Sequence, residues 1–361
     1  VVSSGSRLSP GMAKRDMRLL EDISMDVRYI GFNMQDDKVG HPLKFKDPRK
    51  EANREVELER NRKVRKAMSL AVDSEGLLRI FFNGLGVPAQ FMLPPGIFGY
   101  EAEYENPYRQ YDKELTEARK LLEEAGYPNG VNAETGERLA IDFISGRTDP
   151  RNKMIANFYV EGWQALGIDV TLSATEYNTF QEKMYEGRFQ VFPWGWILDY
   201  PDPENFLFLL YGPNSGKYNP HAPNHTWYEN PEYDYFFKKM ETLTNVGSID
   251  VATTNSTGVA ETVTMSRMDL IRKLRAISEE DCAWIPLYHS AEYIMAQPWT
   301  DSIQPHPITG PWYKYYGMDK EKRDTLRKEW NPPIRWPMFL VPVLLVALIL
   351  PGARVVLRER R

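Results

Sequence analysis

Cysteine is almost absent from this chain of 361 residues, because Cys282 is the only one. A single cysteine excludes an internal disulfide and any metal site built from several thiolates. The five histidines are scattered. His221 and His225 are four positions apart, but Pro223 lies between them, so they do not share a helix face as a zinc-binding helix requires. A metal-dependent hydrolase is therefore only an alternative, and we expect no metal, no cofactor and no catalytic residues.

An excess of charge is also lacking, since the net charge is only -5. No basic stripe alternates with aromatic residues, and we therefore expect no nucleic-acid partner. Hydrophobic residues make up 42% and aromatic residues 12% of the chain, which is enough for a sizeable core. The length allows two domains or one large one.

Charged residues are missing altogether from 336–353, a run that contains three prolines. Its length is at the lower limit for a helix that crosses a bilayer. Four arginines follow within 354–361, and a dense basic tail favours the cytoplasmic side. We expect a transmembrane helix at 336–353 and a basic cytoplasmic tail at 354–361. The alternative is a buried C-terminal helix.

Hydrophobic periodicity predicts an α/β fold. A strand, a helix and a second strand follow one another with short links at 139–143, 151–166 and 168–172, which implies a parallel pair with a right-handed crossover. The highly charged segment 44–63 is predicted to be a solvated loop that leads into a helix. Residues 245–264 are small, polar and β-branched, and are predicted to be a mobile surface insertion between two helices.

An acid surrounded by aromatic residues follows the apolar run 189–192: Trp194, Trp196 and Tyr200 lie around Asp199. We expect this segment to be a loop at the carboxyl end of a strand, where α/β sheets bind ligands. Its composition suits a cationic or amphipathic small ligand. Asp202 is predicted to cap a helix that begins at Pro203. The alternative for Asp199 is a capping or turn residue.

Four stretches resemble the extracellular solute-binding proteins of family 5, which are peptide, dipeptide and oligopeptide receptors of ABC importers. Residues 62–73 are similar to the family pattern VRxAxxxAxD, and residues 111–127 to YDxxxAxxLLxEAGY. Residues 194–203 are similar to GWxxDYPDP, and residues 280–289 to xDxPWIPLYH. The resemblance extends over residues 27–317 in the family's order.

The resemblance implies a periplasmic-binding-protein-like (class II) clamshell of two lobes, of which this chain holds one lobe and part of the other. Residues 1–26 are expected to be a truncated lead-in from the first lobe. Residues 27–280 would form the second α/β lobe, which binds ligand, and 281–330 the returning segment of the first. The predicted transmembrane helix at 336–353 is not usual in this family, and it would be a single-pass anchor that holds the binding domain on the periplasmic or extracellular side of the cell membrane.

The resemblance also implies a function. The protein would capture peptides, or a similar small amphipathic solute, and deliver them to ABC permease subunits. In the family's peptide receptors the acid of the DY motif binds the free α-amino group of the peptide, and that role transfers to Asp199. Trp194, Trp196 and Tyr200 would line the pocket. A membrane-anchored sensor with the same lobes is the alternative within binding proteins.

Overall fold

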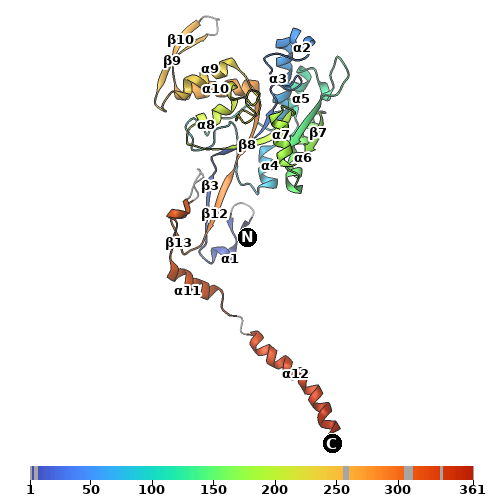
Figure 1. Ribbon diagram of the computed structural model, residues 1–361, viewed down its shortest axis with the longest axis vertical. Coiled ribbons are helices and arrows are strands. Elements are labelled where there is room, and N and C mark those ends of the chain that lie inside the picture. Colours follow the sequence, from blue (N-terminus) through green and yellow to red (C-terminus); the bar gives the residue numbers. More distant parts are fainter. Residues whose placement is uncertain (1, 4–6, 255–259, 305–311, 334–335, 361) are drawn as a thin grey trace.

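The computed structural model describes residues 2–3, 7–254, 260–304, 312–333 and 336–360. A mixed six-stranded sheet lies at the centre of the main body, with helices against it (Figure 1). Its order is β5-β11-β4-β8-β6-β7. The strands are β4 (Asp26–Phe32), β5 (Val87–Pro88), β6 (Ala140–Ser145), β7 (Asp169–Ala174), β8 (Val191–Ile197) and β11 (Trp284–His289). The predicted α/β class is confirmed.

The predicted parallel pair is present. Strands β6 and β7 are parallel and are joined by α6 (Pro150–Gln164). Trp163 of α6 is fully buried, contacts Phe143 of β6 edge to face, and donates an indole hydrogen bond of 3.0 Å to the carbonyl oxygen of Met68. Strand β8 is parallel to β6 and antiparallel to β4, so the carboxyl ends of β6 and β8 lie at the same edge.

One charged segment was predicted wrongly as a loop. Residues 44–63 contain α2 (Pro48–Ala52) and more than half of α3 (Arg54–Leu70). The charges are compatible with a helix because they pair along it, as Glu57 does with Arg60 at 2.8 Å. Leu58 meanwhile is buried against the core.

The other helices of the main body are α4 (Ser74–Phe81), α5 (Thr116–Glu124), α7 (Tyr177–Tyr185), α8 (Glu204–Leu207), α9 (Pro231–Glu241), α10 (Arg267–Asp281) and the short 3-10 turns η1 (Pro128–Gly130), η2 (Phe208–Leu210) and η3 (Gly212–Asn214).

The predicted insertion is a regular β-hairpin on the surface. Strands β9 (Ser248–Thr254) and β10 (Ala260–Ser266) form an antiparallel ladder between α9 and α10, and project from the main body (Figure 1). β-Branched residues favour such a ladder, and Val251 in the middle of β9 is fully buried. Residues 255–259 of the predicted insertion lie outside the described residues.

A two-stranded ribbon leaves the main body. Strand β3 (Arg18–Ile23) pairs in antiparallel fashion with β12 (Ala291–Ala296), and the chain enters the sheet after the first and leaves it before the second. The second lobe was expected to end at residue 280. Strand β11, which follows that position, pairs with β4 within the central sheet. The remaining short elements are β1 (Val2–Ser3), β2 (Arg7–Leu8), α1 (Pro10–Ala13), β13 (Thr300–Asp301), η4 (Trp312–Tyr315), β14 (Gly317–Met318) and α11 (Lys320–Trp330).

Asp26 lies where the two strands of this ribbon meet the central sheet. Its carboxylate accepts hydrogen bonds from the amide and the hydroxyl of Ser290, at 2.8 and 2.7 Å, and one of 3.1 Å from Arg28 Nε. The amide of Ser24 donates to the carbonyl of Ser290 at 2.8 Å. The side chain of Asp26 is buried. The start of β4 and the end of β11 are therefore held together where the ribbon meets the sheet.

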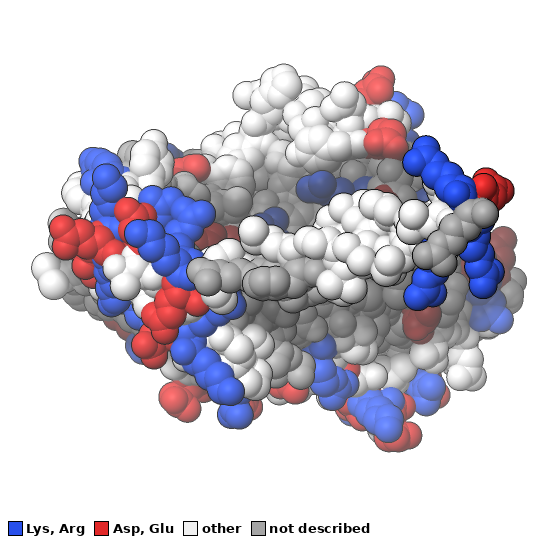
Figure 2. Space-filling model, turned by 90° about the horizontal axis from the view of Figure 1, so that it is seen from below, with Lys and Arg blue, Asp and Glu red and all other residues white. Residues whose placement is uncertain are grey.

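The C-terminal helix α12 (Trp336–Glu359) stands apart from the rest of the chain (Figure 1). It extends beyond the predicted limit at residue 353. An 18-residue stretch within residues 340–359 has a mean hydropathy of 2.4, and none of that stretch is buried, so the alternative of a buried helix is wrong for the described residues. Seen from below, α12 is uncharged along most of its length and has basic side chains near its end (Figure 2). By length and composition alone it could cross a membrane.

Candidate functional site

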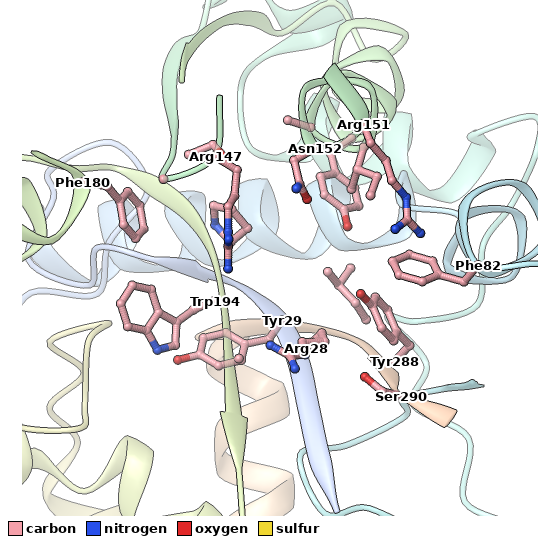
Figure 3. A pocket seen from close by; sticks show the side chains of 18 of the residues that line it. Arg28, Tyr29, Phe82, Arg147, Arg151, Asn152, Phe180, Trp194, Tyr288 and Ser290 are labelled. Carbon is pink, nitrogen blue, oxygen red and sulfur yellow. The ribbon is translucent and has the colours of Figure 1, made fainter. Parts of the chain in front are cut away.

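A cavity of about 490 Å³ lies against one face of the central sheet. Strands β4, β8 and β11 supply one side, and α6, α7 and the turn before α6 supply the other (Figure 3). The turn follows the carboxyl end of β6, where α/β sheets commonly bind ligands. Close packing fixes this turn, since a Cβ atom on Gly146 would lie 2.8 Å from the ring of Phe180.

Three arginines line the cavity: Arg28 of β4, Arg147 of the turn and Arg151 of α6. Arg147 and Arg151 point into it from the α6 side, and Arg28 points in from the sheet (Figure 3). No aspartate or glutamate is among the described residues that line it. Arginine side chains bind carboxylates and phosphates in fork geometry, so the cavity favours a ligand group with negative charge.

The three arginines differ in how they are held. Arg28 pairs with Asp26 at 3.1 Å and lies over Gly195, where an added Cβ atom would be 2.8 Å from its Nη1. Arg151 donates a hydrogen bond of 2.6 Å to the carbonyl of Phe81. Arg147 lies 6.0 Å from the ring of Tyr177 and forms no ion pair within the described part of the chain. Arg147 is thus the one most available to a ligand.

Aromatic side chains form the walls. Trp194 stacks on Phe180 with ring centroids 5.4 Å apart, and Tyr288 packs against Phe82 at 5.0 Å. Burial raises the pKa of Tyr288 to about 12, so its hydroxyl remains protonated and able to donate a hydrogen bond. Apolar walls with a few polar groups are typical of small-molecule sites.

The two predicted tryptophans have different surroundings. Both lie within β8 rather than in a loop, because β8 continues to Ile197 in pairing with β4. Trp194 lines the cavity. Trp196 lies outside its lining, donates a hydrogen bond of 3.2 Å to Asn205 Oδ1, and packs against Phe208 at 5.3 Å.

Asp199 and Tyr200 lie on the surface beyond the end of β8, outside the cavity lining. The amide of Asp199 donates a 2.9 Å hydrogen bond to Asn205 Oδ1, and Asn205 Nδ2 approaches the Asp199 carboxylate at 3.4 Å. Tyr200 donates a hydrogen bond to Glu204, and burial together with that bond raises the pKa of Tyr200 to about 12. The geometry is that of a turn held by Asn205. A ligand role for either residue stays a prediction.

Asp202 has a partner that local sequence does not indicate. Its Oδ1 accepts a 2.9 Å hydrogen bond from the amide of Glu204, as a capping residue would, although Pro203 occupies the cap position. Both carboxylate oxygens also accept hydrogen bonds from Arg267, at 2.9 and 2.6 Å. Arg267 is only 4% exposed. Asp202 therefore connects the start of α8 to the start of α10.

Sequence reasoning missed the three arginines of the cavity. Arg147 carried a usable signal, because it follows a predicted strand directly and precedes a predicted helix. Arg28 carried none, since only the pairing of β4 with β8 brings it next to Gly195. Within the described ranges no group of three or more His, Cys, Asp or Glu side chains could hold a metal ion.

A cavity of this size, with aromatic walls and charged groups at the carboxyl edge of an α/β sheet, has the features of a small-molecule binding site. The fold matches that of a solved structure. The chain superposes on the structure of HbpA2 from Haemophilus parasuis with a TM-score of 0.63 and 21% identity, over 86% of this chain and 51% of that one. The chain belongs to the bacterial extracellular solute-binding proteins of family 5, whose middle-region model matches residues 8–218.

Curated relatives agree with this family. Heme-binding protein A of Haemophilus influenzae is 27% identical over 282 residues, which cover 78% of this chain and 42% of the relative. The oligopeptide-binding protein OppA of Bacillus subtilis is 27% identical over 229 residues, which cover 63% and 37%. The chain thus spans about two-fifths of the length of these relatives. They are named as binding proteins, not as enzymes.

Proposed function

We propose that the chain is the ligand-capturing part of an ABC-importer receptor that binds peptides, or a similar small amphipathic solute, outside the cytoplasmic membrane and delivers them to a permease. The cavity between the central sheet and α6 is the observation that carries this proposal. Its arginines suit a carboxylate, and its aromatic walls suit apolar side chains.

In this proposal the free amino group of the peptide, at the opposite end from its carboxylate, contacts Asp199. Asp199 lies four residues after Gly195, which lines the cavity, so the two are at most about 14 Å apart along an extended chain. An extended peptide of a few residues spans a similar length. The proposed pose places the carboxylate near Arg147 and the amino group toward Asp199. In this pose the facing lobe of the clamshell would cover the peptide on closure.

The proposal is tested by identifying the ligand directly. Full-length protein is purified under native conditions, and the molecules that co-purify are identified by mass spectrometry after denaturation. Peptides, or amphipathic solutes with a carboxylate, are the expected result. Consistent recovery of solutes without any anionic group would contradict the proposed role of the arginines.

Replacement of Arg147 by methionine is expected to weaken binding of the identified peptide at least tenfold. Methionine retains most of the apolar stem but loses the charge-assisted hydrogen bonds, each of which contributes about 1.5–3 kcal/mol. Calorimetric titration measures the change. Arg188→Met is the matched control, because Arg188 is exposed and pairs with Glu186 away from the cavity. Amidation of the peptide carboxylate should weaken binding to the unmutated protein but not to the Arg147 variant. If amidation weakens binding equally in the unmutated protein and in the Arg147 variant, Arg147 does not contact the peptide carboxylate.

We further propose that residues 336–353 anchor the receptor in the membrane. Their part of α12 is uncharged, and the helix is exposed along the length that meets the criteria for a span. Full-length protein is expected to stay in the membrane pellet after washing with alkaline carbonate, as immunoblotting would show. A variant that lacks 336–361 should appear in the supernatant. If both proteins wash off equally, α12 is not an anchor.

A further inference from the structure

A second cavity, of about 320 Å³, lies far from the first, beside the segment that leads to α12. It is formed where the residues that follow β12 meet α11 and the segment after α1. Its lining includes three arginines, two tryptophans and one glutamine: Arg15, Arg323, Arg327, Trp299, Trp330 and Gln297. No step of the peptide-binding proposal uses this cavity.

Among the described residues, the three arginines of this second cavity have no counterion. None of them forms an ion pair with a carboxylate in the ranges that the structure describes. Arg15 lies over the ring of Trp330 at 5.1 Å, and Trp330 packs against Trp299 at 5.3 Å. The rings therefore hold one guanidinium in place, and within the described part of the chain its hydrogen-bond donors have no partner.

Gln297 adds a second, independent observation. Its Oε1 atom is buried and has no hydrogen-bond partner among the described residues. A buried polar atom without a partner is costly and calls for a ligand group or water. Because the amide can be turned by 180°, Gln297 can offer either an acceptor or two donors to a group in the cavity. A phosphate with an adjoining hydroxyl would satisfy the amide and the arginines together.

The position of the second cavity indicates where such a phosphate would come from. Trp330 ends α11 and Trp336 begins α12, so they are six positions apart in the chain and within about 20 Å of each other. Figure 1 shows α11 between the β3–β12 ribbon and α12. If 336–353 crosses the bilayer, the cavity lies near the headgroup level of the leaflet next to the binding domain. Tryptophan is favoured at that level on both sides of a membrane, and an arginine beside it can bind a headgroup phosphate in fork geometry.

We propose that this second cavity binds the phosphate of an anionic lipid headgroup. The inference rests on the proposed membrane anchoring, to which it adds a specific lipid contact. Bound lipid would hold α11 against the bilayer and fix the distance of the binding domain from the membrane. Arg15, Arg323 and Arg327 would contact the phosphate, and Trp299 and Trp330 the glycerol and the first part of the acyl chain.

The test uses the full chain, purified in mild detergent with equal amounts of phosphatidylglycerol and phosphatidylcholine, and counts retained lipids by native mass spectrometry. The unmutated protein is expected to retain one phosphatidylglycerol in preference to phosphatidylcholine. The triple variant Arg15→Gln, Arg323→Gln, Arg327→Gln should retain it at least tenfold less. The triple variant Lys320→Gln, Lys322→Gln, Lys328→Gln loses the same charge on exposed positions outside the cavity lining and should behave like the unmutated protein. Equal retention of both lipids, or equal losses in both variants, would overturn the site.

A second arm separates the lipid from a free phosphate and from the anchoring itself. Glycerol 3-phosphate is titrated into the delipidated protein, where no bilayer is needed. Retention of phosphatidylglycerol with no tight binding of glycerol 3-phosphate supports a lipid site. Tight binding of glycerol 3-phosphate without lipid retention overturns the lipid source. If lipid retention persists although carbonate extracts the protein, the headgroup site stands and the transmembrane anchor fails. A lower unfolding temperature of the arginine variant without any change in lipid retention would show a purely structural cluster and overturn the site.

Discussion

Replacement of Asp281 by alanine is expected to lower the free energy of unfolding by about 3–5 kcal/mol, the usual cost of removing one member of a buried ionic network. Asp281 ends α10 and is only 3% exposed. Its carboxylate accepts hydrogen bonds from Tyr228 at 2.6 Å and Asn230 at 2.9 Å, and lies 3.0 Å from His41 Nδ1 and 3.3 Å from Arg62 Nη2. Alanine would leave these four groups without their common partner.

The same carboxyl group should make the free energy of unfolding depend on pH in the acid range. Burial alone would raise the pKa of Asp281, but hydrogen bonding and charge from His41, with hydrogen bonds from Tyr228 and Asn230, hold it well below the usual range. A group with a lowered pKa stabilises the fold above its unfolded pKa, about 4, and this contribution is lost as the pH falls below that value. Asp281→Asn keeps the shape but not the charge, and should therefore flatten the acid limb of the stability profile.

Urea unfolding from neutral pH down to about pH 3 measures both effects. Asp324→Ala serves as the control, because Asp324 is an exposed acid on α11. Its expected change is within about 0.5 kcal/mol, as for most surface substitutions. A loss below about 1 kcal/mol for Asp281→Ala, or an unchanged acid limb for Asp281→Asn, would contradict the importance of this network.

The second large effect concerns the proposed amino-group contact. In the receptor closed on a peptide, Asp199→Ala is expected to weaken binding by about 2–5 kcal/mol, because a ligand ammonium group would be left desolvated and unpaired. Asp199→Asn should cost nearly as much, since it retains shape but loses charge. Calorimetry with one peptide in free and N-acetylated form gives the comparison. Acetylation should reproduce the Asp199 defect in the unmutated protein.

Asp202 provides the control for Asp199, because it lies in the same segment and contacts a buried arginine instead. Asp202→Ala removes the carboxylate that Arg267 binds, so it should lower the unfolding temperature and leave peptide affinity nearly unchanged. Equal affinity of the unmutated protein for free and acetylated peptides would remove the amino-group role. Asp199 would then be only a turn residue held by Asn205.

Local patterns predicted the elements whose neighbours follow closely in the chain. The unit β6–α6–β7 was predicted from apolar alternation and a short link, and both are properties of adjacent residues. The position of β11 could not be predicted in this way. It lies between β4 and β5, more than 190 residues earlier in the chain, and nothing in its own residues specifies those partners.

The candidate site shows the same limit. The aromatic and acidic residues of 194–203 stood out because they are adjacent in sequence. The cavity owes its positive charge to Arg28, Arg147 and Arg151. Arg28 and Arg147 are 119 positions apart and meet only through the order of β4, β8 and β6. An interpretation based on one segment therefore favoured a cationic ligand group, whereas the assembled cavity favours an anionic one.

The β3–β12 ribbon has a mechanical consequence. Two separate linkers would let the main body and the segments beyond the ribbon move independently. Here both connections belong to one hydrogen-bonded ladder, in which Ile23 lies opposite Ala291. A torque on one strand is therefore transmitted to the other. Arg28 and Ser290 both line the cavity and both bind Asp26 at the end of this ladder. A ligand that draws Arg28 away from Asp26 would weaken the contacts that hold the ribbon at the sheet, and the ribbon could then bend more easily. By thermodynamic reciprocity, bending of the ribbon would in turn change the affinity of the cavity for that ligand.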